Sequence, residues 1–339
     1  MANVIKGTVD VSELAARLAP LVEAATGTPI APGDLRLTKM PTGMSSVTFR
    51  LDTPTTRMAV KLAPPGLEPV RNRDVLRQAR VLLALGDAAE VVVPGVLFQD
   101  AGDPPDVPPM FAMTFEDGEC FEPQSDAGDV PPPDVVTARA RSAAHMMAAL
   151  HAVPADHPAV EGEPEIALRD EVARWINLFA TVNDELRPYP ADACGERLMA
   201  ALPDAGPPAL IHGDYRLGNI IYDGIEPRAI IDWEIWAVED PRIDLAWFML
   251  NSDPDKPSAV RRDVGMPPLD ELLGLYEDRR GSPVADLDWF HALVRFKQAA
   301  VSASIVKNNR KRGTADARIE RMTDYIAPLL DRAMVHLAR

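Results

Sequence analysis

The sequence predicts an α+β protein in which a small, strand-rich part precedes a mainly helical part. Two runs with the composition of β-strands, Ser46–Leu51 and Arg57–Leu62, flank a segment rich in turn-forming residues. After residue 119, most apolar residues recur at helical spacing. Proline-rich stretches at Asp100–Pro109 and Glu122–Pro133 separate the two parts, because proline fixes φ and lacks an amide donor.

The first part contains one predicted helix and a strand that leads out of it. Within Arg71–Leu85, the residues Val75, Ala79 and Leu82 recur at intervals of four and three, the period of an amphipathic helix. The run Met110–Glu119 lies between the two proline-rich stretches and begins as an apolar strand. We expect the chain to cross from the first part to the second in this run.

The second part predicts a series of helices with one β-rich interruption. Its first helix runs from Asp134, a residue type that caps helix N-termini, to Leu150. The interruption contains a short strand, Ala209–Ile211, and a hairpin whose strands are Asn219–Tyr222 and Arg228–Ile231. We expect further helices over residues 165–186, 244–251, 269–280, 285–308 and 315–338.

Composition restricts the class of protein. The 339 residues carry 35 Lys and Arg against 51 Asp and Glu, a formal net charge of −16. A chain this acidic is a poor general binder of nucleic acid, since phosphate neutralisation supplies most non-specific affinity. The sequence shows neither the apolar run of a membrane span nor a signal peptide, so we expect a cytoplasmic protein with no membrane partner. Two cysteines exclude a disulfide framework.

The predicted hairpin indicates a metal site. If the hairpin is symmetric about a five-residue turn, Asp223–Pro227, then Asn219 lies opposite Asp232. Opposed residues of an antiparallel pair lie about 5 Å apart. An amide oxygen and a carboxylate at that separation can share one hard cation such as Mg²⁺. Asp214, five residues before Asn219, could then accept a proton from a substrate hydroxyl, a division of labour that suits phosphoryl transfer.

The same region resembles a known family. The blocks HGDYRLGN, IDWE and EDPRIDLAW occur in the order and spacing of the aminoglycoside phosphotransferase (phosphotransferase enzyme) family. The resemblance implies a bilobal protein-kinase-like fold with a small antiparallel-sheet N-lobe and a mainly helical C-lobe. It implies that Asp214 is the catalytic base, that Asn219 and Asp232 hold Mg²⁺, and that Asp244 is a buried acid that positions the loop.

Less specific blocks extend the resemblance toward the N-terminus. MPTGMSSVTFRL is similar to the family's nucleotide loop, where Gly43 permits close backbone approach and Ser45 or Ser46 can donate to phosphate. RMAVKL places Lys61 as the lysine that contacts the α- and β-phosphates. The stretch around Met113 and Phe115 resembles the hinge that binds an adenine edge.

The helix that partners the lysine departs from the family pattern. Where the family has glutamate, this chain has Gln78, which can orient an ammonium group but cannot neutralise it. Asp74, one helical turn earlier, is the alternative partner. The substitution raises three possibilities: a loosely held lysine, replacement by Asp74, or slow turnover.

By this resemblance, residues 1–115 form a nucleotide-binding lobe, the hinge lies at 113–118, and residues 119–339 form the lobe with the catalytic loop and the acceptor site. ATP, with GTP as the alternative, and Mg²⁺ are the expected cofactors. The expected partner is a small molecule with a hydroxyl group, whose identity the sequence does not specify; the oligomeric state is likewise unspecified.

Several functions stay open at this stage. The proline-rich, apolar character resembles bacterial proteins similar to the kinase-like domain of acyl-CoA dehydrogenase fusions, which favours a non-antibiotic acceptor. An aminoglycoside acceptor is the alternative, supported by the acidity of residues 119–339. Gln78 motivates a catalytically silent nucleotide-binding protein. A protein kinase is disfavoured, because only 11 residues separate Asp232 from Asp244 and leave no room for an activation segment.

Overall fold

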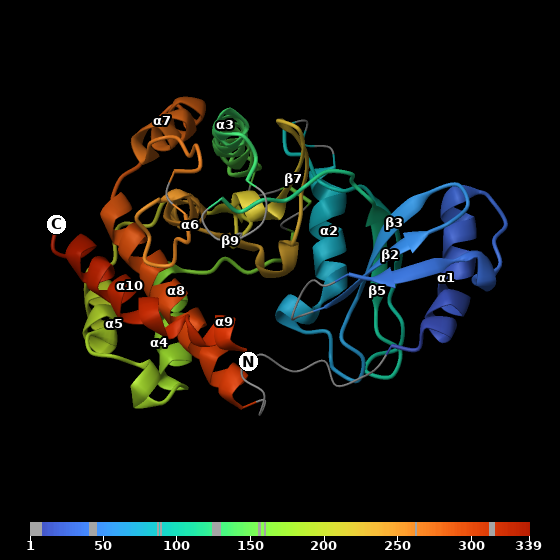
Figure 1. Cartoon of the computed structure of the whole chain (residues 1–339), viewed down its shortest axis with the longest axis horizontal. Helices are drawn as coiled ribbons and strands as arrows, with labels where there is room; N and C mark the ends of the chain where they lie inside the picture. Colours follow the sequence, from blue (N-terminus) through green and yellow to red (C-terminus); the bar gives the residue numbers. More distant parts are fainter. Residues whose placement is uncertain are drawn as a thin grey trace. The chain divides into compact units, whose positions relative to one another are not determined.

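The chain folds into two compact units, seen in the computed structural model of Figure 1. The structure describes residues 9–40, 46–86, 88, 90–123, 130–154, 157–158, 161–261, 263–311 and 316–339. The first unit comprises the chain through Gly118 together with Arg228–Ile235. The second comprises Glu119–Pro227 and Trp236–Arg339. The predicted assignment of nucleotide and acceptor binding to residues 1–115 and 119–339 stays a prediction.

The first unit is built on an antiparallel sheet of five strands, in the order β1-β2-β3-β5-β4. This confirms the small antiparallel sheet predicted for the N-terminal part. Apolar, β-branched and aromatic residues are frequent in β2 and β3, two of its three interior strands, which suits a pleated surface covered on both faces. The strands are β1 (Arg36–Lys39), β2 (Val47–Asp52), β3 (Arg57–Leu62), β4 (Val96–Asp100) and β5 (Met110–Thr114).

Two helices, α1 (Val11–Thr26) and α2 (Val75–Leu85), cover opposite faces of this sheet (Figure 1). Successive residues of a strand point to opposite faces. Val60 of β3 belongs to the apolar cluster that contains the buried face of α1, whereas its neighbour Lys61 contacts α2. The 3₁₀ turns η1 (Pro32–Asp34) and η2 (Arg71–Arg73) lie just before β1 and α2. The sequence analysis did not predict α1.

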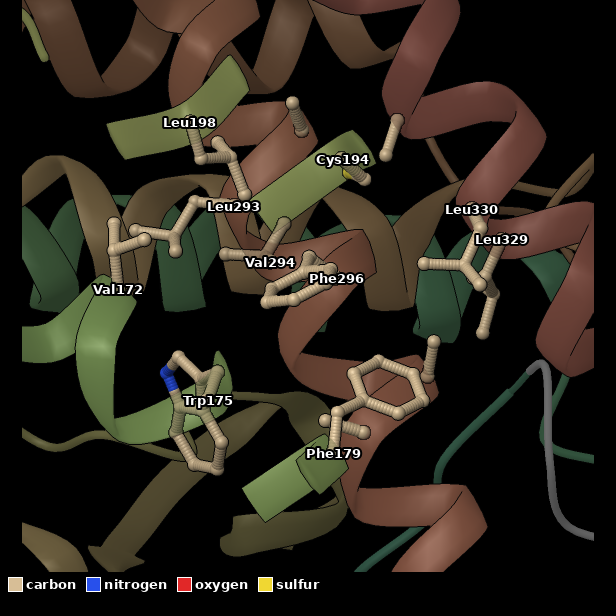
Figure 2. Close-up of a cluster of buried hydrophobic side chains, with 14 of the residues drawn as sticks. Val172, Trp175, Phe179, Cys194, Leu198, Leu293, Val294, Phe296, Leu329 and Leu330 are labelled. Atoms are coloured by element: carbon tan, nitrogen blue, oxygen red, sulfur yellow. The ribbon is translucent and has the colours of Figure 1, made fainter. Parts of the chain in front are cut away.

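The second unit is mainly helical, as predicted, and its core surrounds α8. Figure 2 shows this core, in which Phe296 and Leu293 of α8 lie among Trp175, Phe179 and Leu330 from neighbouring helices. The helices are α3 (Pro133–Leu150), α4 (Leu168–Ala180), α5 (Ala191–Ala200), α6 (Arg242–Ser252), α7 (Leu269–Arg280), α8 (Leu287–Arg310), α9 (Ala317–Glu320) and α10 (Thr323–His336). One 3₁₀ turn, η3 (Asp184–Leu186), lies between α4 and α5.

Asp134 does not cap α3. The helix begins after Pro132, and no side chain accepts a hydrogen bond from its first amides. Pro133 occupies the first helical position, where its fixed φ suits the helix and its missing N–H would have had no partner within the helix. Asp134 lies instead in the first turn, where its charge suits the helix dipole.

The β-rich interruption of the second part folds into two short strand pairs. β6 (Ala209–Ile211) pairs antiparallel with β9 (Ala237–Glu239), and β7 (Ile220–Asp223) pairs with β8 (Glu226–Ile230). The turn of the second pair is Gly224–Ile225, shorter than the five residues predicted, because Gly224 takes a positive φ of 60°. The predicted pairing of Asn219 with Asp232 across the hairpin is wrong, because Asn219 lies in a 3₁₀ turn before β7 and Asp232 lies beyond the end of β8. Their joint binding of Mg²⁺ stays a prediction. The 3₁₀ turns η4 (Leu217–Asn219) and η5 (Trp233–Ile235) flank the hairpin.

Candidate functional site

Asp214 lies in the loop between β6 and β7, and three side chains hold its carboxylate. Residues 212–219 are called the Asp214 loop below. Asn219 Nδ2 donates to Asp214 Oδ2 at 2.9 Å, and Arg216 Nε donates to the same oxygen at 3.3 Å. Trp247 Nε1 donates to Oδ1 at 2.7 Å. The Asp214 side chain nevertheless keeps 26% of its surface exposed, so it is both oriented and accessible.

A buried carboxylate anchors the backbone of this loop. Asp244, on α6, is fully buried and accepts from the backbone N–H groups of His212 at 2.6 Å and Gly213 at 2.8 Å. Burial alone would raise the pKa of Asp244, but His151, whose Nε2 lies 3.5 Å away, and His212 outweigh it, and the pKa falls below its usual value. The sequence-based interpretation of Asp244 as a structural acid agrees with these contacts.

Lys297 anchors the next peptide group of the loop, that between Gly213 and Asp214. Its Nζ donates to the carbonyl oxygen of Gly213 at 2.9 Å and lies 4.7 Å from the ring centroid of Trp247. The lysine is buried, which makes these partners necessary. Lys297 and Trp247 therefore fix Asp214 from α8 and α6.

Asn219 orients the carboxylate through one half of its amide. Its Nδ2 donates both to the backbone oxygen of Asp214 at 2.8 Å and to the carboxylate, so Oδ1 is the atom left to face a cation. An amide oxygen of this kind suits a hard cation such as Mg²⁺. The side chain is buried, which fixes this orientation.

A buried charged cluster adjoins the loop through Arg216. Arg216 Nη1 donates to Glu122 Oε2 at 3.3 Å, and the N–H of Gly218 donates to the same oxygen at 3.1 Å. Burial raises the pKa of Glu122, although the charges of Lys256 and Arg216 oppose the shift. Burial likewise lowers the pKa of Lys256. Arg216 thus links Glu122 to Asp214.

In the first unit, Lys61 lies between an amide and a carboxylate. Its Nζ donates to Gln78 Oε1 at 2.8 Å and lies 3.2 Å from Asp232 Oδ1. Asp74 instead caps α2 by accepting from the N–H of Arg77. The structure therefore places Gln78, and not Asp74, against the lysine. The Nε2 of Gln78 is buried and finds no hydrogen-bond partner in the described part of the chain.

Asp232 has a strained backbone. Its φ of 65° lies in the left-handed region, which costs a residue with a Cβ about 1 kcal/mol or more. Such strain persists where the surroundings hold the residue, and the contact with Lys61 is one such restraint. With Oδ1 on Lys61, the second carboxylate oxygen remains as a ligand of the type that Mg²⁺ prefers.

The other residues predicted to contact the nucleotide are Gly43, Ser45, Ser46, Met113 and Phe115. Gly43 and Ser45 lie outside the described residues. Ser46 is buried directly before β2, and its hydroxyl has no hydrogen-bond partner within the described ranges. Met113 lies in β5 opposite Ala59 and is half-buried. Phe115 follows the strand, also half-buried, with the guanidinium of Arg57 5.3 Å from its ring centroid.

The sequence analysis did not identify four residues around Asp214: Trp247, Arg216, Glu122 and Lys297. Two of them, Trp247 and Lys297, have a recognisable position in the sequence. Trp247 follows Asp244 by three residues in a predicted helix, which puts both on one face. Lys297 lies next to Phe296 and three residues before Ala300, within an otherwise apolar stripe. A lysine in such a stripe must find a partner, and here that partner is the Asp214 loop.

Glu239 should make stability depend on pH. Burial and the charge of Glu171 raise its pKa well above the usual value, although Lys297 and Arg174 oppose this. No described residue makes a hydrogen bond to its Oε1. A raised pKa stabilises the folded state below the unfolded-state value of about 4.3, and this stabilisation is lost as pH rises. We expect Glu239→Gln to flatten the decline in melting temperature between pH 5 and pH 8. Parallel curves for the two proteins would contradict the assignment.

Comparison with known proteins places this geometry in a family. The model of the phosphotransferase enzyme family matches residues 36–293. "Probable acyl-CoA dehydrogenase IBR3" of Arabidopsis thaliana is 25% identical over 312 residues, covering 83% of this chain and 37% of that protein. "Acyl-CoA dehydrogenase family member 11" of Homo sapiens is 30% identical over 151 residues, covering 40% and 19%. The chain thus spans well under half the length of these relatives.

Solved structures support the fold. A candidate aminoglycoside phosphotransferase from Ralstonia eutropha JMP134 superposes with a TM-score of 0.76 at 22% identity, covering 97% of this chain and 98% of that one. Macrolide 2′-phosphotransferase type I gives 0.62 at 21%, covering 95% and 99%. At such identities the likeness shows the fold alone, and it confirms the predicted bilobal kinase-like class.

No helix within the described ranges has the length and apolarity needed to cross a membrane. The family model covers more than three quarters of the chain and includes both Lys61 and the Asp214 loop. By this match, the protein belongs to the phosphotransferase enzyme family.

Proposed function

We propose that the protein transfers the γ-phosphoryl group of ATP to a hydroxyl group of a small molecule, with Asp214 as the base. The observation that carries this proposal is the carboxylate of Asp214, accessible yet held by Asn219, Arg216 and Trp247. Phosphoryl transfer needs mainly positioning and charge neutralisation. A carboxylate with fixed orientation can align an acceptor hydroxyl and take its proton.

In this proposal Asn219 and Asp232 would hold Mg²⁺, each through an oxygen not used by its protein partner. When bound, the ion supplies charge neutralisation for the phosphate oxygens. Lys61 would contact the α- and β-phosphates, and Gln78 would keep its ammonium group in place. Ser46, Met113 and Phe115, with Gly43 and Ser45, would complete the nucleotide site.

The acceptor is proposed by chemical class only. The acyl-CoA dehydrogenase relatives favour a non-antibiotic hydroxyl compound. An aminoglycoside is the alternative acceptor, suggested by neighbours such as the hygromycin B complex of APH(4)-Ia. Gln78 favours one further candidate, a nucleotide-binding protein without turnover, because an amide does not neutralise Lys61.

A melting experiment tests the nucleotide site. The protein is heated with ATP or GTP, each with and without Mg²⁺. A ligand at 100 times its Kd that binds only the folded state adds about 2.7 kcal/mol, enough to shift the midpoint by several degrees. We expect a shift that requires Mg²⁺. Release of ADP that depends on an added alcohol would then support transfer, whereas binding without any release would favour the silent protein.

The Gln78→Glu variant tests the lysine contact. The Lys61 ammonium already donates a charge-assisted hydrogen bond to the Gln78 amide, and a carboxylate in its place would add neutralisation of the lysine charge. We expect a higher kcat/KM for ATP in Gln78→Glu and a lower one in the matched Gln78→Leu variant, measured by ADP release. Equal values for Gln78→Glu and the parent protein would contradict a role for this contact in positioning the lysine.

A further inference from the structure

A cationic pocket lies in the second unit, apart from the Asp214 loop. It has a volume of about 330 Å³ and is formed by the end of α6, the start of α7, the first half of α8 and the end of α10. Figure 1 shows α6, α8 and α10 within this unit. Neither Asp214 nor any side chain that holds its carboxylate lines the pocket. Its lining is Met249, Asp253, Leu269, His291, Arg295, Arg332, Val335, His336 and Arg339.

The lining carries more positive than negative charge. Arg295 and Arg332 share a single carboxylate, that of Asp253, at 3.6 and 4.0 Å. Arg339 pairs with Asp288 at 3.3 Å, an oxygen that also receives His336 Nδ1 at 2.7 Å. Three guanidinium groups thus face two carboxylates. This surplus occurs in a chain with a net charge of −16, where an unneutralised cationic cluster is unexpected.

Two buried nitrogen atoms of the pocket lining have no hydrogen-bond partner among the residues that the structure describes. Arg295 is 93% buried, and although Nη1 donates to the carbonyl oxygen of His291 at 3.1 Å, its Nε is unpaired. The Nδ1 of His291 is also unpaired. Burial lowers the pKa of Arg295 to about 10 and that of His291 to about 3, so Arg295 is charged and His291 neutral near pH 7. Buried charged groups normally find partners, so the unpaired Nε of Arg295 points to a missing acceptor. In its Nδ1–H tautomer, the neutral ring of His291 can donate to the same acceptor.

Apolar side chains form another part of the pocket lining, called the apolar wall below. Met249 of α6, Leu269 of α7 and Val335 of α10 contribute to it, and Val335 is 57% exposed. A lining that combines cationic side chains with this apolar wall suits a ligand with an anionic head and a short hydrocarbon body. Inorganic anions alone would leave the apolar wall uncovered.

We propose that this pocket binds a small organic anion, a carboxylate or a phosphate monoester, with its oxyanion on Arg295, Arg332 and His291 and its apolar body on Met249, Leu269 and Val335. The site is independent of the proposed phosphoryl transfer, since it shares no residue with the proposed nucleotide and metal contacts. Carboxylate and phosphate oxygens both match the forked donors of arginine.

Calorimetric titration of the full chain with four probes tests this site. Hexanoate and hexyl phosphate carry both features, 1-hexanol lacks the anion, and inorganic phosphate lacks the apolar body. We expect saturable binding of one or both organic anions, with weaker binding of hexanol and inorganic phosphate. The tighter of the two organic anions identifies the head group. No saturable binding of either organic anion, or binding of hexanol that equals theirs, would overturn the proposal.

Two partly exposed positions locate the binding. Arg332→Gln removes one cation, and Val335→Asp places a negative charge on the apolar wall; both positions tolerate change better than buried Arg295. We expect each to weaken binding of the organic anions about tenfold or more, since a hydrogen bond to a charged group contributes about 1.5–3 kcal/mol. Arg318→Gln, an exposed arginine outside the pocket, is the matched control and should bind normally. Unchanged binding in both folded pocket variants would place the anion elsewhere and refute this site.

Discussion

Asp214→Asn should lower turnover by at least about a hundredfold while leaving nucleotide binding close to that of the parent protein. Loss of a positioned general base typically lowers the reaction rate by a factor of about 10²–10⁴, and Asp214→Asn removes such a base. The amide also cannot accept from Asn219, Arg216 and Trp247 at once, because one of its two polar atoms is a donor. The measurement is alcohol-dependent ADP release, with the nucleotide-induced shift in melting temperature measured alongside.

The matched control is Asp278→Asn, which changes an exposed aspartate on α7. It should leave both readouts unchanged. Near-normal turnover in Asp214→Asn would eliminate Asp214 as the base. Loss of nucleotide binding together with turnover would instead indicate that the loop has lost its structure, which the melting temperature without ligand would reveal.

Asp244→Ala should destabilise the second unit by about 3–5 kcal/mol, the cost typical of removing one partner from a buried charged network. The backbone N–H groups of His212 and Gly213 would lose their acceptor inside the protein, and each buried, unpaired donor costs about 1–3 kcal/mol. The carboxylate is fully buried, so water cannot replace it without rearrangement. Denaturant unfolding, followed by tryptophan fluorescence, measures the loss.

The Asp244→Asn variant keeps one of the two acceptor oxygens, so it can retain one of the two hydrogen bonds to the backbone. We expect its free energy of unfolding to lie between those of the parent protein and Asp244→Ala. The exposed Asp278→Ala should change it by less than about 0.5 kcal/mol. A free energy of unfolding for Asp244→Ala equal to that of Asp278→Ala would show that Asp244 does not support the loop.

Local patterns in the sequence were sufficient for most of the secondary structure near the site. β3 and α7 have the predicted bounds, and β6 lies where the short strand was expected. These elements are short or strongly patterned, with composition that leaves one conformation favoured. The errors lie at boundaries and turns: Pro133 displaced the cap expected at Asp134, and Gly224 shortened the hairpin turn.

The partner of Lys61 shows where local reasoning ended. Gln78 and Asp74 lie one helical turn apart on the predicted helix, so the sequence allowed either side chain to contact Lys61. The helix begins immediately after Asp74, whose carboxylate is consumed as the cap, and this start leaves Gln78 against the sheet. A cap is decided by where packing lets the helix begin, which depends on the sheet beneath it.

The sequence by itself determined the fold class, several of the strands, most helices of the second unit, and the candidate residues Asp214, Asn219 and Asp232, because these follow from periodicity and from motifs confined to short segments. It did not predict α1, α5, β1, β4 or β9. Only the tertiary structure decided which distant side chains hold Asp214 in place. Trp247 and Lys297 reach the loop from α6 and α8. Their hydrogen bonds join residues 33 and 84 positions apart in the chain, and such contacts exist only once the helices have packed.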